Sequence, residues 1–280
     1  MNYIDVFYDT HDGLRLYARD YPGPTTEAPT VICLPGLTRN GKDFAPLAEH
    51  LRKSYRVICP DQRGRGRSAR DPDPGNYRPD VYANDMWCLA DLLKLASFCI
   101  VGTSLGGLMA ILMAARSPDR VARIVLNDVG PEIDPQGIAR IAGYVGKSSP
   151  VRTWTDAAEQ TAATNGAAFP EYTQADWMEM ARNVYIQEGE TPVLDYDPLI
   201  ARGVASGSAA PDLWPLFSAI GKVPMLAIRG VLSDILSEAT LASMSRRLAN
   251  LTTVEVPNRG HAPTLAEEAA LTSIRKFLSI

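Results

Sequence analysis

The residues most able to do chemistry in this chain are a serine between glycines and a small number of histidines. The serine stands in Gly102-Thr103-Ser104-Leu105-Gly106, which matches the pattern G-x-S-x-G. That pattern forms a sharp strand-to-helix turn, which presents the hydroxyl and needs small residues where the backbone is crowded. A serine hydroxyl becomes a nucleophile when a neighbouring base removes its proton. We therefore expect Ser104 to be a nucleophile, with Gly102 and Gly106 making room for the turn.

Histidine is the usual base for a serine hydroxyl, and the chain has three histidines. His11 lies in a predicted turn, and His50 lies off the apolar face of a predicted helix. We expect both side chains to be exposed. His261 lies in a loop after the last predicted strand, at the sheet edge where Ser104 is also expected. This placement predicts that His261 is the base.

The imidazole of such a base needs a carboxylate that orients it and stabilises its protonated form. Two aspartates follow predicted strands at the same sheet edge. Asp234 is favoured, because the chain order Ser104, Asp234, His261 is the order described for this serine motif. Asp128 is the alternative acid, and it would otherwise be a hydrogen-bonding residue at the end of its strand.

Acyl transfer at a serine also needs backbone N–H donors for the oxyanion of the tetrahedral intermediate. One expected donor is the N–H of Leu105, directly after the serine. The other expected donor is the N–H of Leu37, in the loop after the first strongly apolar strand.

The elements that position these residues alternate between strand and helix. The strands read as continuous apolar runs, which are typical of a parallel sheet buried on both faces. We expect strands over 30–36, 55–61, 98–101, 121–128, 223–230 and 252–258. Helices are expected over 44–51, 79–96, 105–116 and 239–249, and from 265 to the end of the chain. An N-terminal hairpin comes first, so the expected fold is α/β, with a mostly parallel, doubly wound sheet.

One long segment interrupts this alternation. Between residues 133 and 215 the sequence shows Ala-rich helical stretches, three tryptophans and a capping-box pattern at Thr173-Gln174-Ala175-Asp176. Ligands in open α/β sheets bind at the carboxyl ends of the strands. We therefore expect 133–215 to be a helical cap over a pocket, inserted into a catalytic core made of 1–132 and 216–280.

Composition excludes several classes of protein. The chain has 280 residues, with 28 Lys and Arg against 32 Asp and Glu, and the net charge of −4 disfavours nucleic-acid binding. Cys33, Cys59 and Cys99 lie in apolar strand patterns, so we expect buried cysteines and no disulfides. The sequence shows no metal-ligand cluster, phosphate loop or dinucleotide fingerprint, so neither a metal nor a cofactor is expected.

Two observations bear on localisation. The N-terminus shows no basic region followed by an apolar stretch, so no signal peptide is expected. Residues 95–115 carry no charge, but the glycines in the middle of this run argue against a membrane helix. We therefore expect a cytoplasmic protein without a membrane partner.

Taken together, the motifs resemble those of the α/β-hydrolase superfamily, specifically its cap-bearing serine esterases, lactonases and carbon–carbon hydrolases. The motifs that carry the resemblance are Leu34-Pro35-Gly36-Leu37, the segment 61–68 (DQRGRGRS), Gly102–Gly107, the segment 229–234 (RGVLSD) and the segment 260–265 (GHAPTL). The resemblance implies Ser104 as nucleophile, His261 as base and Asp234 as acid, with a helical cap between the sixth and seventh strands.

The chain departs from this family pattern at one motif and differs from some subfamilies at another. Pro35-Gly36 stands where family members usually have His-Gly, although the oxyanion donor there is backbone. Ser104 distinguishes the chain from the similar dehalogenases and epoxide hydrolases, whose nucleophile is an aspartate. We expect the arginines of 61–68 to form a solvated loop face, and attraction of an anionic substrate is the alternative.

The function expected from these residues is hydrolysis of a small carboxylic ester or lactone through an acyl-enzyme. The partner would be a small, ester-like molecule. One alternative is a hydrolase that cleaves a carbon–carbon bond in a ring-fission product. The other is a ligand-binding protein on the same fold.

Overall fold

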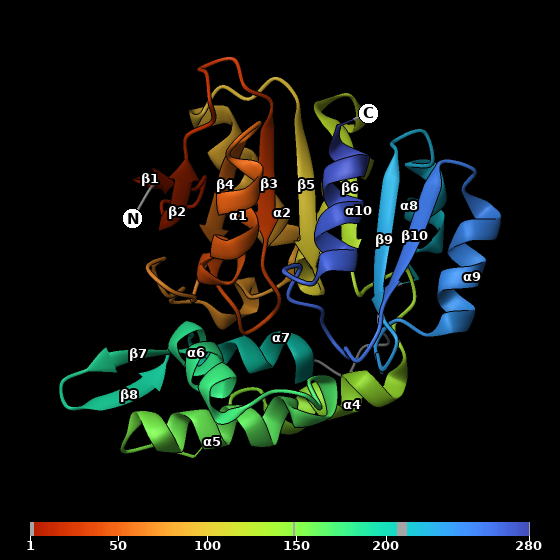
Figure 1. Cartoon of the computed structure of the whole chain (residues 1–280). Helices are drawn as coiled ribbons and strands as arrows, with labels where there is room; N and C mark the ends of the chain where they lie inside the picture. The colour runs from red at the N-terminus through yellow and green to blue at the C-terminus, as the bar shows by residue number, and fades with distance from the viewer. Residues whose placement is uncertain (1–2, 148, 206–211, 280) are drawn as a thin grey trace.

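An eight-stranded sheet runs through the middle of the molecule (Figure 1). The computed structural model describes residues 3–147, 149–205 and 212–279. Along the sheet the strands follow the order β1-β2-β4-β3-β5-β6-β9-β10, in which β1–β2 and β2–β4 pair antiparallel and the other neighbours pair parallel. The strands are β1 (Ile4–Asp9), β2 (Arg15–Tyr21), β3 (Thr30–Leu34), β4 (Arg56–Asp61), β5 (Phe98–Thr103), β6 (Val121–Asn127), β9 (Met225–Gly230) and β10 (Leu251–Val256). The predicted mostly parallel α/β sheet is confirmed.

Helices cover both faces of this sheet. One face packs against α1 and α10, and the other packs against α2, α3 and α8, while α9 lies beside β10. These helices are α1 (Ala45–Leu51), α2 (Pro79–Leu92), α3 (Leu105–Arg116), α8 (Trp214–Ala219), α9 (Glu238–Arg247) and α10 (Glu268–Leu278). The doubly covered sheet explains why its central strands contain unbroken apolar runs.

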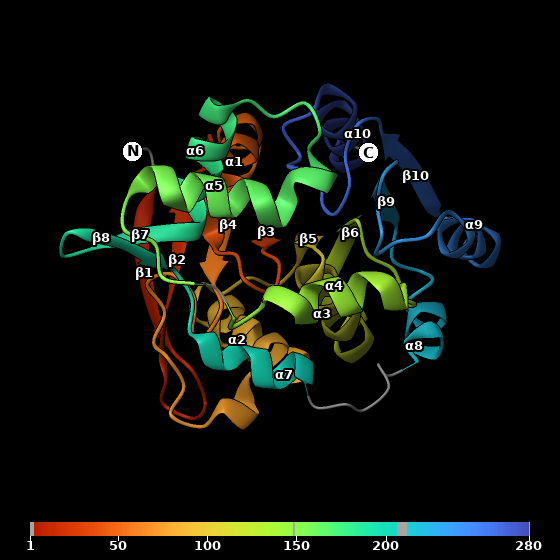
Figure 2. The same cartoon turned by 90° about the horizontal axis from the view of Figure 1, so that it is seen from below.

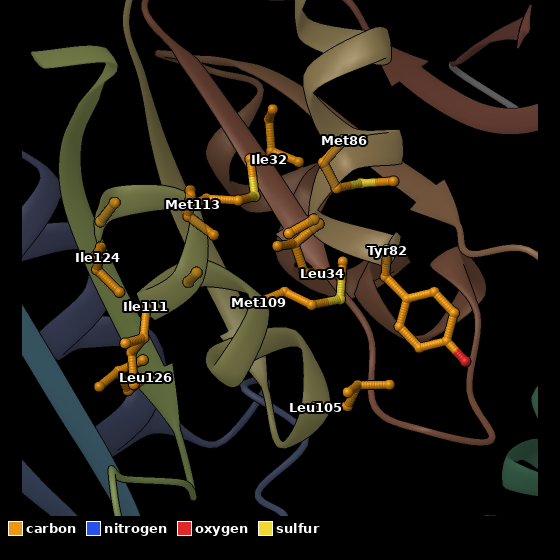
Figure 3. Packing of buried hydrophobic residues seen from close by; sticks show 14 of the residues in the cluster. Ile32, Leu34, Tyr82, Met86, Leu105, Met109, Ile111, Met113, Ile124 and Leu126 are labelled. Carbon is orange, nitrogen blue, oxygen red and sulfur yellow. The ribbon is translucent and has the colours of Figure 1, made fainter. Parts of the chain in front are cut away.

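The core around α3 supports the carboxyl ends of the neighbouring strands. Figure 3 shows Met109 and Met113 of α3 beside Leu34 of β3, all fully buried. Helix α3 is apolar on nearly all sides, as expected of a helix enclosed by a sheet and by neighbouring helices. On the strands, Cys33, Cys59 and Cys99 are buried and free, as predicted.

The segment between β6 and β9 leaves the sheet and lies across the carboxyl ends of the strands (Figures 1 and 2). It contains α4 (Pro135–Tyr144), α5 (Trp154–Asn165), α6 (Gln174–Val184), β7 (Tyr185–Glu188), β8 (Thr191–Leu194) and α7 (Ala201–Ala205). The capping box at Thr173 and Asp176 does open α6, as predicted. We call α4 to α7, with the β7–β8 hairpin, the inserted segment.

Two features of the inserted segment differ from the sequence expectation. The β7–β8 hairpin stands where only helices were expected. Its strands have four residues each and turn at Gly189, whose φ of 58° favours glycine. Strands this short give too few alternating positions to be recognised. The expected boundary at residue 215 lies inside α8, and the expected cap includes 148 and 206–211, which lie outside the described residues.

Two arginines of the 61–68 segment are buried, and the expectation of a solvated loop face is wrong for them. Arg63 and Arg65 are each 1% exposed, whereas the side chain of Arg67 is 46% exposed. Neither buried arginine lines the cavity described below, so neither contacts a substrate there. Both are buried cations that hydrogen-bond to residues of other loops. A buried cation requires acidic or carbonyl partners, and the spacing of residues in the sequence does not identify those partners.

Candidate active site

The strand-to-helix turn at Ser104 has the strained backbone that its motif predicts. Ser104 joins β5 to α3 with φ 53° and ψ −118°, a conformation that L-residues rarely adopt. A Cβ on Gly102 would overlap the carbonyl of Gly106, and a Cβ on Gly106 would overlap the carbonyl of Leu34. Both glycines are therefore required by the close approach of backbone to backbone.

This crowding makes a prediction about stability. Gly106→Ala should lower the free energy of unfolding by about 1–3 kcal/mol, because β3 or α3 must shift to admit the methyl group. Gly143→Ala is the matched control, since a Cβ at that exposed position of α4 meets nothing within 4 Å. Thermal and urea unfolding of both variants checks this, and equal stability of the two would contradict the crowded turn.

The structure joins a serine, a histidine and an aspartate in a hydrogen-bonded chain. His261 Nε2 lies 2.8 Å from Ser104 Oγ, and His261 Nδ1 lies 2.8 Å from Asp128 Oδ2. The serine comes from the end of β5, the aspartate from the end of β6 and the histidine from the loop after β10. This is the arrangement in which an imidazole can accept the serine proton while a carboxylate fixes its orientation.

Asp128 is fully buried and strongly held. Its Oδ1 accepts a hydrogen bond from the Gly230 N–H at 2.8 Å, and its Oδ2 accepts one from the Ser233 hydroxyl at 2.6 Å. Its own N–H donates to the Ile228 carbonyl at 2.7 Å, and its φ is 56°. These bonds to β9 and its following loop aim the carboxylate at His261 and compensate for its burial.

The expected pairing of Asp234 with His261 is not what the structure shows. Asp234 instead forms a bidentate pair with Arg140 of α4, with Nη2 2.8 Å from Oδ1. Burial raises the pKa of the Asp234 carboxyl, but the hydrogen bond and charge of Arg140 outweigh burial, and the net shift is downward. The sequence alone does not indicate that Arg140 of the inserted segment pairs with Asp234. The available signal was that Asp128 ends the strand next to the one that ends at Ser104.

The loop after β3 lies beside the serine. Leu37 lines the same cavity as Ser104, while Leu105 is the first residue of α3, so its N–H lies at the helix N-terminus. Two buried side chains hydrogen-bond to the backbone of this loop. Arg65 Nε donates to the Leu37 carbonyl at 2.8 Å, and Gln62 Nε2 donates to the Pro35 carbonyl at 3.0 Å. One function of the 61–68 segment is thus to fix this loop.

A cavity of about 300 Å³ opens at the serine and histidine, between the sheet edge and the inserted segment. Its walls combine residues of the β3 loop with residues of α4, α5, α6 and β8. Arg39 also lies in this wall and was not among the predicted site residues; a charged residue two positions after the expected oxyanion donor was the available signal. His11 and His50 are exposed, as expected, and are not part of the wall.

The fold and this site define a known class of protein. The family model described as the alpha/beta hydrolase fold matches residues 29–265. The chain belongs to the α/β-hydrolase family. None of the described helices is both long and apolar enough to cross a membrane.

Several relatives resemble the chain over nearly its whole length. It is 34% identical over 279 residues to a 3-hydroxybutyrate-oligomer hydrolase from Cupriavidus necator, covering 95% of this chain and 94% of the relative. It is 30% identical over 255 residues to a 2-(acetamidomethylene)succinate hydrolase from Mesorhizobium japonicum, covering 89% and 88%. A solved α/β hydrolase from Novosphingobium aromaticivorans superposes with a TM-score of 0.94 at 40% identity, covering 99% and 98%.

Proposed function

We propose that this protein is a serine hydrolase that cleaves a small carboxylic ester or lactone through an acyl-enzyme. The observation that carries the proposal is the chain of two 2.8 Å contacts from Ser104 through His261 to Asp128. Ser104 and His261 line the cavity, which gives a substrate carbonyl access to the hydroxyl.

The geometry supports a two-step reaction. His261 Nε2 takes the proton of Ser104 as its Oγ attacks the carbonyl carbon, and the same proton then passes to the leaving alkoxide. Asp128 is the positioning carboxylate, which keeps Nδ1 protonated and stabilises the imidazolium. The N–H groups of Leu37 and Leu105 donate to the developing oxyanion. Water, activated by His261, then attacks the acyl carbon and releases the acid.

One relative supports ester chemistry among the reactions open to this fold. The hydrolase from Cupriavidus necator is named for oligomers of 3-hydroxybutyrate, a hydroxy acid whose units are joined by ester bonds. The cavity of about 300 Å³ suits a small molecule. The 2-(acetamidomethylene)succinate hydrolase is named for a different substrate, so family membership alone does not identify the substrate.

A substrate panel tests the proposal. It contains 4-nitrophenyl esters of increasing acyl length, lactones of different ring size and a vinylogous ring-fission diketone. We expect turnover of esters or lactones, with a burst of 4-nitrophenol equal to the enzyme concentration if deacylation is the slower step. Turnover of the diketone alone would replace the proposal with carbon–carbon hydrolysis, and no turnover of any compound would favour a ligand-binding protein.

The base role of His261 predicts the pH dependence. Only neutral imidazole can accept the serine proton, so kcat/KM should fall steadily as the pH decreases from 8 to about 5. Stopped-flow or initial-rate measurements with a neutral ester avoid titration of the substrate. A flat profile across this range would contradict the role of His261.

A further inference from the structure

One cationic side chain lies in the cavity wall beside the serine. A Cβ placed on Gly36 would lie 3.7 Å from Arg39 Cγ and 3.7 Å from Ser104 Cβ. Arg39 and Ser104 therefore both approach Gly36, and both residues line the cavity. Within the described part of the chain, no lysine and no second arginine lines this cavity.

The guanidinium of Arg39 is fixed by an aspartate. Asp43 accepts hydrogen bonds from Nε and Nη2, each at 2.6 Å, and this pair leaves Nη1 outside it. Burial lowers the pKa of Arg39, but the charge and hydrogen bonds of Asp43 outweigh burial, and the net shift is upward. Arg39 is thus a permanent cation whose planar fork is oriented before any ligand arrives.

Two further acidic residues of the wall are placed so that they compete little for this cation. Asp176 accepts hydrogen bonds from the Thr173 N–H at 2.8 Å and hydroxyl at 2.7 Å, as the cap of α6. Glu179 is exposed, so its charge is screened by water and salt. Much of the wall that α5 and α6 contribute is polar, which suits an oxygen-rich ligand: Gln160, Thr161, Thr164, Asn165 and Asn183.

We propose that Arg39 binds a carboxylate of the substrate, and that the preferred substrates are therefore esters that carry a free carboxylate. The inference rests on the proposed ester hydrolysis at Ser104. Nη1 and the outer N–H of Nη2 donate to the substrate carboxylate, while Asp43 accepts from Nε and from the other N–H of Nη2. An arginine fork matches the planar geometry of a carboxylate, and such charge-assisted bonds are stronger in a partly enclosed site than in water.

Two matched substrate pairs test this and also locate the carboxylate. In the first pair, 4-nitrophenyl hydrogen adipate and 4-nitrophenyl hexanoate differ by a carboxylate on the acyl side. In the second pair, 3-(butanoyloxy)butanoate and but-2-yl butanoate differ by one on the alcohol side, and a pH-stat follows their hydrolysis. The quantity compared is the anionic-to-neutral ratio of kcat/KM.

Replacing the cation should change this ratio in the pair that matches the natural substrate. We expect Arg39→Gln to lower it by about 10- to 100-fold, mostly through KM, and Arg39→Lys to lower it less because the charge remains. Arg78→Gln is the control: that arginine is exposed on the surface and outside the cavity, so its ratio should stay at the wild-type value. A change of less than about threefold in both pairs for Arg39→Gln would overturn the proposal.

A binding measurement separates failure of this inference from failure of the proposed function. Adipate is titrated by calorimetry into Ser104→Ala protein with Arg39 present and into the double variant with Arg39→Gln. We expect the double variant to bind adipate at least about tenfold more weakly. Equal binding would overturn the role of Arg39 even if every ester is cleaved. Absence of ester cleavage would overturn the proposed function and leave this titration valid.

Discussion

Asp128→Asn should reduce kcat for ester hydrolysis by about 10,000-fold, the scale of effect when the carboxylate partner of a catalytic histidine becomes an amide. The amide has nearly the same shape, but its NH₂ group cannot accept a hydrogen bond from Nδ1–H and instead donates one to Nδ1, so His261 is held in the wrong tautomer. The amide oxygen of the variant can still accept one bond from Gly230 or Ser233, which favours a folded protein. Steady-state kinetics at pH 8 with a neutral ester, together with a circular dichroism spectrum, measures the effect.

Asp234→Asn is the matched control, because it removes the other candidate carboxylate in the same way. Its partner is Arg140, and the two side chains are about one third exposed. Loss of such a pair should cost less than about tenfold in kcat/KM, since a partly exposed ion pair contributes little. A large loss with Asp234→Asn and a small loss with Asp128→Asn would contradict the geometry and restore the order expected from sequence.

Arg63→Met should destabilise the protein by about 3–5 kcal/mol, the largest effect on stability that we expect. Arg63 donates to both oxygens of Asp85 at 2.8 and 2.6 Å, and it also pairs with Asp71 and with Asp12 of the first hairpin. Methionine fills much of the space but leaves two buried carboxylates without their cation. Urea unfolding gives the free energy of unfolding directly.

A control variant and the pH dependence distinguish loss of the buried Arg63 charge from a general loss of packing. Arg67→Met removes a half-exposed arginine paired with Asp5 and should cost less than about 1 kcal/mol. Burial raises the pKa of Asp85 to about 6, with Arg63 opposing this shift. Without Arg63 the folded state favours protonated Asp85 more strongly, so the deficit of Arg63→Met should be smaller at pH 5 than at pH 8. A deficit that does not change with pH would indicate lost packing instead.

The main sheet could be predicted because each of its central strands carries its own signal. Strands β3, β4 and β5 contain the unbroken apolar runs VICL, VIC and FCIV, whose residues are all buried, and only a sheet covered on both faces buries both sides of such runs. The turn at Ser104 was predictable because its G-x-S-x-G pattern lies within five consecutive residues, although the contact that requires Gly106 is made with Leu34 of β3.

The unexpected partner of His261 and the buried arginines share a cause, which is that both depend on contacts between distant parts of the chain. Asp234 was favoured from chain order, but it pairs with Arg140 of the inserted segment. Ser233 and Gly230 donate hydrogen bonds that hold Asp128 in place. Arg63 looked solvated because three arginines alternate with glycines, and its acidic partners lie 8 to 51 residues away along the chain. The hydrophobic periodicity of a sequence does not indicate such pairings.

The most direct test of the central claim is the labelling of the serine by a fluorophosphonate probe, read by intact mass and by peptide mass spectrometry. Activation of Ser104 by His261 and Asp128 predicts one adduct on the wild-type chain, located at Ser104 and absent from Ser104→Ala. It also predicts much slower labelling of Asp128→Asn, whereas Asp234→Asn should label at nearly the wild-type rate. An unlabelled wild-type protein, or labelling that persists in Ser104→Ala, would contradict the account.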